Sequence, residues 1–125
     1  MPDALTITFP MPLNLANARL HWRVKHNAKV AYWETLDNLQ TVKRIPAPPK
    51  TPWTKVRVAS VMVVGAAMDD GNAMNRHKWV EDWLVTRGYL VDDSKKHLTW
   101  DGVPTQRISR KEPASITLTL TQEAA

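Results

Sequence analysis

The alternation of apolar and polar residues marks three segments of the chain as β-strands. In residues 4–9 (ALTITF) and 114–121 (ASITLTLT), apolar side chains alternate with hydroxyl-bearing ones, and this period of two is typical of a half-buried strand. Residues 55–65 (KVRVASVMVVG) are rich in β-branched side chains and almost continuously apolar, which favours a strand that is buried on both faces.

Two longer segments have the apolar spacing of amphipathic helices. Between residues 19 and 44, apolar side chains recur every three or four positions, which predicts either one bent helix or two. Residues 72–87 form a second candidate helix, with Asp70 or Asn72 as its N-terminal cap and Gly88 at its end. The apolar residues that share one face of this helix are Val80, Trp83 and Leu84.

The order of these elements predicts the class of fold. The prolines of residues 45–53 remove backbone donors and indicate a loop, and a short strand is expected around the sequence HLTW, residues 97–100. The order is therefore strand, helix, strand, helix, strand, strand. It predicts an α/β fold of the α+β kind, with a mixed sheet and helices packed mainly on one face. A length of 125 residues suits a single domain that spans residues 1–125.

Composition narrows the class of protein. The chain has no cysteine, which excludes disulfides and thiolate metal sites. It has neither an apolar run of membrane-spanning length nor a charged region followed by an apolar block, so we expect a cytoplasmic protein without a membrane partner. The net charge of +5 and pI of about 9.7 suggest a polyanionic partner.

Acidic residues gather in one window of this basic chain. Between residues 69 and 93 lie six of the 12 acidic residues but only three of the 17 basic ones. The six are Asp69, Asp70, Glu81, Asp82, Asp92 and Asp93.

Two pairs of aspartates in this window bracket the second predicted helix. If the chain doubles back after Gly88, these pairs meet, and clustered carboxylates become favourable when a hard cation such as Mg²⁺ neutralises them. Such a site can activate water for attack on a phosphodiester. The alternative for the sequences DDGN and VDDS is an ordinary turn or helix cap. Likewise, Lys78 and Asp82 have the i, i+4 spacing of a common surface ion pair.

The central motif resembles that of the RusA-like Holliday-junction resolvases, a family common in phages and prophages. The residues that carry the resemblance are Asp69, Asn72, Lys78, Asp82, Gly88 and the Asp92–Asp93 pair. The resemblance implies a homodimeric endodeoxyribonuclease that depends on Mg²⁺, with Mn²⁺ as a possible substitute, and that resolves branched DNA. It also implies roles for individual residues. The implied catalytic residues are Asp69, Lys78 and Asp93, and the implied metal ligands are Asp69, Asp70, Asp92 and Asp93.

One departure from the family pattern opens an alternative. Gly71 stands where the family has its second aspartate, which predicts weaker metal binding. A branched-DNA-binding protein that cuts weakly or not at all is therefore the second hypothesis. A third is an acid-rich domain that binds other proteins, which would have no affinity for DNA at low salt.

Basic and aromatic residues outside the acidic window are candidates for contact with DNA. Arginine and lysine side chains position DNA through its phosphates, and the alternative for the basic run near residue 20 is a solvated helix start. The predicted phosphate contacts are Arg19, Arg23, Lys25, Lys29, Arg76, Lys95 and Lys96. Trp22, Trp33 and Trp53 are candidates for stacking on opened bases, with core packing as the alternative.

Overall fold

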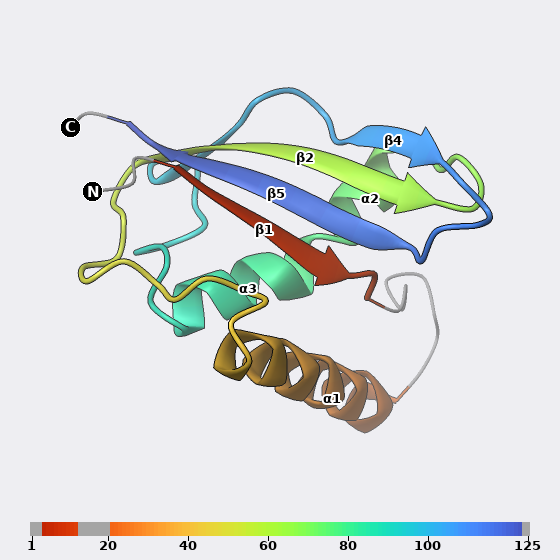
Figure 1. The fold of residues 1–125 in the computed structure, drawn as a ribbon, viewed down its shortest axis with the longest axis horizontal. Helices are drawn as coiled ribbons and strands as arrows, with labels where there is room; N and C mark the ends of the chain where they lie inside the picture. The colour runs from red at the N-terminus through yellow and green to blue at the C-terminus, as the bar shows by residue number, and fades with distance from the viewer. Residues whose placement is uncertain (1–3, 13–20, 124–125) are drawn as a thin grey trace.

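The computed structural model describes residues 4–12 and 21–123 and has one sheet covered by helices on one face (Figure 1). The described residues form five strands and three helices. The strands are β1 (Ala4–Pro10), β2 (Val56–Val64), β3 (Leu98–Trp100), β4 (Thr105–Ile108) and β5 (Ser115–Gln122). The helices are α1 (Trp22–Thr41), α2 (Asp70–Asn75) and α3 (Lys78–Thr86). This confirms the predicted class, a mixed sheet with helices packed against it.

The sheet is antiparallel on one side of β2 and parallel on the other. Strand β5 pairs antiparallel with both β1 and β2. The opposite edge of β2 is shared by two short parallel strands, because β3 pairs with Val56–Val58 and β4 pairs with Val61–Val64. Sequence reasoning missed β4. Its sequence, TQRI, is short and mostly polar, so it lacks the apolar alternation by which a strand is recognised.

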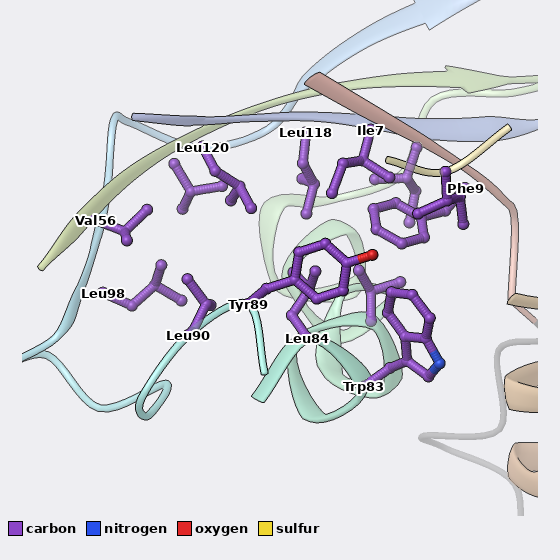
Figure 2. Packing of buried hydrophobic residues seen from close by; sticks show 14 of the residues in the cluster. Ile7, Phe9, Val56, Trp83, Leu84, Tyr89, Leu90, Leu98, Leu118 and Leu120 are labelled. Atoms are coloured by element: carbon purple, nitrogen blue, oxygen red, sulfur yellow. The ribbon is translucent and has the colours of Figure 1, made fainter. Parts of the chain in front are cut away.

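The hydrophobic core lies between the sheet and the helices (Figure 2). Side chains from alternate positions of β1, β2 and β5 point toward α3, where Trp83 and Leu84 meet them. Phe9 of β1 packs edge-on against Trp83 at 6.2 Å between ring centroids, and Trp83 lies 5.4 Å from Tyr89. The predicted apolar face of the second helix is confirmed, because Val80, Trp83 and Leu84 are all buried.

The prediction that β2 is buried on both faces is wrong. Arg57 and Val61 are exposed, with 43% of Val61 accessible, while Val56, Val58 and Met62 are buried. The apolar run at the end of the strand hid this alternation. All three helices lie on the same side of the sheet (Figure 1), so among the described residues no helix covers the other face.

The single helix predicted over residues 72–87 is two helices. The break falls at Arg76 and His77, where the His77 backbone N–H donates to the carbonyl of Met74 at 3.0 Å. The His77 ring is fully buried, with Nδ1 2.8 Å from the Ala73 carbonyl and Nε2 2.7 Å from Ser60 Oγ on β2. The break coincides with this contact between His77 and the sheet, which no local pattern reveals.

The ends of the helices follow recognisable capping chemistry. Asp69, rather than Asp70 or Asn72, caps α2, since its Oδ1 accepts a hydrogen bond from the Asn72 backbone N–H at 2.8 Å. Gly88 ends α3 as predicted, with φ of 85°, a conformation that favours glycine. Segment 19–44 contains one helix, α1, which starts at Trp22; residues 19 and 20 lie outside the described part of the chain.

Candidate active site around Lys78

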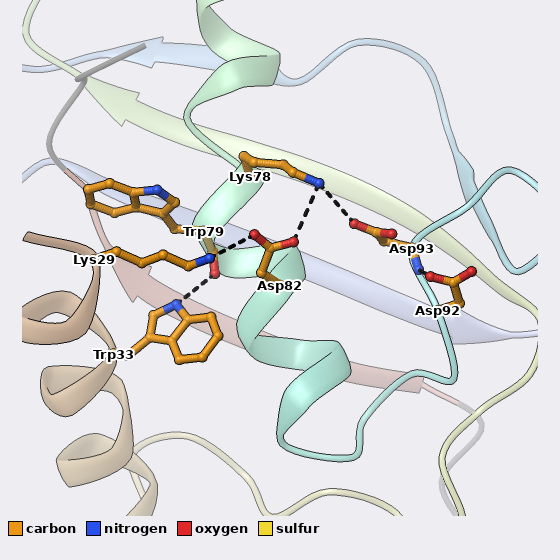
Figure 3. A network of polar contacts seen from close by, with 7 residues as sticks. All are labelled: Lys29, Trp33, Lys78, Trp79, Asp82, Asp92 and Asp93. Carbon is orange, nitrogen blue, oxygen red and sulfur yellow. Dashed lines mark hydrogen bonds and ion pairs between the residues drawn. The ribbon is translucent and has the colours of Figure 1, made fainter. Parts of the chain in front are cut away.

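Lys78, the first residue of α3, lies between two carboxylates (Figure 3). Its Nζ is 3.2 Å from Asp93 Oδ2 and 3.4 Å from Asp82 Oδ1. The lysine side chain is 62% exposed, and each aspartate side chain is 26% exposed. Two residues that the sequence proposed as catalytic, Lys78 and Asp93, are therefore in direct contact at the protein surface. The contact with Asp82 is the i, i+4 pair expected from helix geometry.

The return of the chain after α3 brings Asp93 to the start of that helix. The N–H groups of Gly88 and Tyr89 donate to the carbonyls of Val85 and Leu84, the double hydrogen bond of a Schellman turn. Leu90 then forms a parallel bridge with Trp53 in the proline-rich loop. The turn reverses the chain, and the bridge fixes its path, so that Asp93 reaches Lys78. The meeting of this aspartate pair with Asp69 and Asp70 stays a prediction.

Asp92 and Asp93 have different surroundings. Asp92 is exposed, and its Oδ1 accepts a hydrogen bond from the Asp93 backbone N–H at 2.8 Å. This hydrogen bond is the main reason why the pKa of Asp92 is lowered. Asp92 therefore stays ionised beside the Lys78–Asp93 pair and adds a further negative charge at the surface.

Helix α1 supplies the other cation of this network. Lys29 Nζ is 3.1 Å from Asp82 Oδ2, and the same ammonium lies 4.8 Å from the centroid of the Trp33 ring. Trp33 in turn donates its indole N–H to the Trp79 carbonyl at 3.1 Å (Figure 3). Lys29, predicted as a phosphate contact, is 29% exposed and forms an ion pair that places Asp82 between two lysines.

Glu81 is a site residue that sequence reasoning missed. Burial, and next the negative charge of Asp93, raise its pKa from 4.5 to about 7, although a hydrogen bond with Trp100 and the charge of Lys78 partly oppose the rise. Its position three residues after Lys78 places it near that residue on the helix surface. The sequence contained this spacing, but it gave no sign that Glu81 would be partly buried beside another carboxylate.

The other predicted metal ligands, Asp69 and Asp70, lie at the start of α2. Both carboxylate oxygens of Asp69 accept hydrogen bonds from Asn72, at 2.8 Å from its backbone N–H and 3.1 Å from its side-chain amide. Asp70 is exposed in the first turn of α2. A Cβ at Gly71 would lie 3.5 Å from Asp69 Oδ1. An aspartate at position 71, as in the RusA-like motif, would therefore lie next to Asp69.

The donor set around Lys78 is of the type that a hard cation prefers. Asp82, Asp92, Asp93 and Glu81 supply only oxygen donors, the ligand type that Mg²⁺ prefers. Within residues 4–12 and 21–123, however, no group of three or more histidine, aspartate or glutamate side chains is arranged to hold a metal ion. The convergence of Asp69 and Asp93 on one ion therefore stays a prediction.

The predicted phosphate contacts have varied environments. Arg23, Lys95 and Lys96 are exposed, the latter two in the turn that follows Asp93, and Lys25 is half-buried. Arg76 Nη1 donates to the Pro12 carbonyl at 3.1 Å, and its Nε is buried without a hydrogen-bond partner in the described chain. Burial also lowers the pKa of Arg76. Arg19 lies outside the described residues.

Neither a scan of protein-family models nor a search of curated proteins finds a match to this chain. The resemblance to RusA-like resolvases thus depends on the motif alone. Among the described helices, none has the length and apolar character needed to cross a membrane.

Proposed function

We propose that this protein is a Mg²⁺-dependent endonuclease that resolves Holliday junctions or other branched DNA by phosphodiester hydrolysis, with Mn²⁺ as an alternative ion. The observation that supports this most is the contact of Lys78 with Asp93, two residues that are 15 positions apart and that the family motif assigns to one site. An exposed ammonium among carboxylates in a chain of net charge +5 suits a phosphate substrate.

The residues of the site have distinct proposed roles. Asp93 and Asp92, together with Asp69 and Asp70, would hold the metal ion, which when bound supplies a nucleophilic water and neutralises charge on the phosphate. Lys78 stabilises the charge that develops on the scissile phosphate. Asp82 holds the Lys78 ammonium close to Asp93, because its two carboxylate oxygens contact Lys78 and Lys29.

Cations beside the acidic site would guide DNA toward it. Lys95 and Lys96 are exposed two and three residues after Asp93. Their ammonium groups would contact the phosphates that flank the one being cut, without reading base sequence. The same proposal includes a homodimer, in which two sites act on symmetric strands of a junction, and a cytoplasmic location, which is the host cytoplasm if a phage encodes the protein.

A second candidate function is binding of branched DNA without efficient cleavage. Two observations favour it. Gly71 supplies no second carboxylate at the position where the RusA-like motif has one. Both Asp69 oxygens already accept hydrogen bonds from Asn72. In this case the Lys78–Asp93 ion pair stays intact without a metal ion, and the basic side chains nearby bind DNA phosphates without cleavage.

Cleavage of a labelled four-way junction, with Mg²⁺ or with EDTA, separates the two functions. We expect the wild-type protein to cut only with Mg²⁺, and we expect Asp93→Asn to abolish cutting while junction binding is retained or tightened, because one repulsive charge near the phosphate is lost. Gly71→Asp should increase cleavage at limiting Mg²⁺, since a side chain at position 71 fits beside Asp69.

The outcomes of this assay are distinct. Junction binding without cutting under any metal condition would refute the nuclease and leave the binding protein. Loss of both binding and cutting in Asp93→Asn would show that the substitution unfolds the protein, which circular dichroism would detect. The absence of any DNA affinity at low salt would favour a protein-interaction domain instead.

A further inference from the structure

The first turn of α1 presents a tryptophan to solvent. The Trp22 side chain is 64% exposed, the largest value among the exposed large hydrophobic residues of the described chain. In contrast, Trp53 is 6% exposed and Trp83 is fully buried. Of the three tryptophans considered for base stacking, Trp53 is buried and Trp33 is partly buried against the core. Trp22 is the one of these three that is classed as exposed.

The ring of Trp22 is bordered by aromatic and cationic groups. The His21 ring lies 5.8 Å from it at 31° between planes, and the His26 ring lies 6.3 Å away. The Arg23 guanidinium is 5.7 Å from the ring centroid. His21 is also held by the helix start, because its Nδ1 accepts a hydrogen bond from the Arg23 backbone N–H at 3.2 Å. These neighbours flank the ring without burying it.

The surroundings of Trp22 attract anions. From residue 21 to residue 33 the sequence contains no acidic residue, while it contains Arg23, Lys25 and Lys29. The first turn of α1 is likewise free of acids, so nothing there offsets the positive end of the helix dipole. An aromatic ring beside cations is the arrangement by which proteins hold unpaired nucleotides, since bases stack on the ring while phosphates meet the charges.

Trp22 also lies in line with the acidic site. Residues 22, 26, 29 and 33 follow one stripe of the helix, and Lys29 on that stripe reaches Asp82, the partner of Lys78. Seven residues of helix separate Trp22 from Lys29, a distance of about 10 Å along the axis. This is roughly the length of three stacked nucleotides.

We propose that Trp22 is a stacking platform for unpaired bases of DNA, with Arg23 and Lys25 contacting the adjacent phosphates. The platform would hold the opened strand beside a branch point while the neighbouring phosphodiester reaches Lys78. The inference takes DNA as the partner from the proposed function, but it does not require that the protein cut DNA.

The test is binding of single-stranded and duplex DNA by the full chain in EDTA at low salt. Fluorescence anisotropy of a labelled oligothymidylate and of a duplex of equal length gives both affinities. Trp22→Ala should weaken single-strand binding roughly 5- to 150-fold, the range that loss of a stacked base produces, with at most about a twofold effect on duplex. Trp22→Phe should retain most of the affinity, and Trp22→Leu should behave like Trp22→Ala because it lacks a π face.

The matched control is Val42→Ala, which removes a side chain that is 63% exposed at the other end of α1. It should leave both affinities unchanged. Because Trp22 is largely exposed, circular dichroism should be the same for all variants. Wild-type affinity of Trp22→Ala or Trp22→Leu for the single strand would overturn the proposal, as would equal losses on single strand and duplex. Failure of the wild-type protein to bind the single strand would also overturn it.

These outcomes are independent of the junction-cleavage assay. A protein that cuts junctions but shows no effect of Trp22 on single-strand binding keeps the proposed function and loses the platform. A protein that never cuts but loses single-strand affinity in Trp22→Ala keeps the platform and loses the nuclease.

Discussion

Two ion-pair networks join α1 to α3, and they differ in how completely their charges are balanced. Near the end of α3, Asp37 accepts hydrogen bonds from Arg87 Nε and Nη2, each at 2.8 Å, and from the Trp83 indole N–H at 2.9 Å. One carboxylate thus meets one guanidinium in a two-pronged contact. At the start of α3, Lys29 and Lys78 contact Asp82 and Asp93, with Glu81 and Asp92 close by.

The pKa values of one carboxylate in each network, Asp37 and Glu81, shift in opposite directions. The hydrogen bond from Arg87 is the main cause of a lowered pKa at Asp37, so the ionised form is stabilised there. At Glu81, burial and the charge of Asp93 raise the pKa to about 7, so the ionised form is destabilised. A saturated pair of this kind serves the fold. A carboxylate whose ionised form is destabilised by burial and a neighbouring negative charge is one that a cation can stabilise.

The largest effect is expected on the rate of cleavage when Lys78 is substituted. Under single-turnover conditions Lys78→Gln should slow junction cleavage about 100-fold or more, as removal of one group that stabilises transition-state charge usually does. Lysine and glutamine are both good helix formers, so circular dichroism should not change. Lys50→Gln, at an exposed position in the proline-rich loop, is the matched control and should cut normally. A normal rate for Lys78→Gln would reduce the Lys78 network to a surface ion pair.

The next largest effect is expected on the pH dependence of the free energy of unfolding, through the titration of Glu81. Its pKa is higher in the folded state, about 7, than the ordinary value of 4.5, so the folded protein binds more protons between these values. The contribution of Glu81 to stability should therefore be greatest below pH 4.5 and should fall as the pH rises to about 7, by up to about 3 kcal/mol.

Urea unfolding of wild-type protein and of Glu81→Gln across this pH range measures the contribution of Glu81. The glutamine variant should lack the fall, because it cannot ionise. Other titrating groups contribute equally to both proteins, so the difference between the two curves isolates Glu81. Parallel curves would show that Glu81 has the same pKa in the folded and unfolded protein.

Substitutions in the Asp37 network should lower the stability of the protein and leave its cleavage activity unchanged. Asp37→Asn removes the charge that meets Arg87, and we expect it to cost about 1–2 kcal/mol in the free energy of unfolding. The cleavage rate of the folded variant should not change. Arg87→Lys should cause a similar loss, because an ammonium cannot reproduce the two-pronged contact. A slowed cleavage step in Asp37→Asn would mean that both networks serve the site and that the contrast between them is wrong.

The smallest effects are expected at Arg23 and Lys25, two basic residues outside both networks. Arg23→Gln and Lys25→Gln should each weaken binding to all DNAs alike and should reduce the slope of log affinity against log salt by about one. Binding titrations at several salt concentrations measure this slope. An unchanged slope would show that neither side chain contacts a phosphate.

Much of the fold follows from local patterns in the sequence. The alternation in residues 4–9 and 114–121 predicts β1 and β5, because a strand places successive side chains on opposite faces. Gly88 ends α3 because its φ of 85° suits a residue without Cβ. The Lys78–Asp82 contact follows from the helical repeat. In each case the interacting groups are a few residues apart, so their geometry is fixed by the element itself.

Tertiary structure decided the features that depend on distant partners. The hydrogen bond between Ser60 and His77 joins residues 17 positions apart, and it lies at the break between α2 and α3. Lys29 and Asp82 meet across 53 positions, a contact that the spacing along the chain does not indicate. The exposure of one face of β2 and the raised pKa of Glu81 likewise depend on which elements cover which surface. The spacing of residues along the chain indicates the period of a single helix or strand. Burial and charge pairing depend instead on how separate elements pack, and this packing is fixed only when the whole chain is folded.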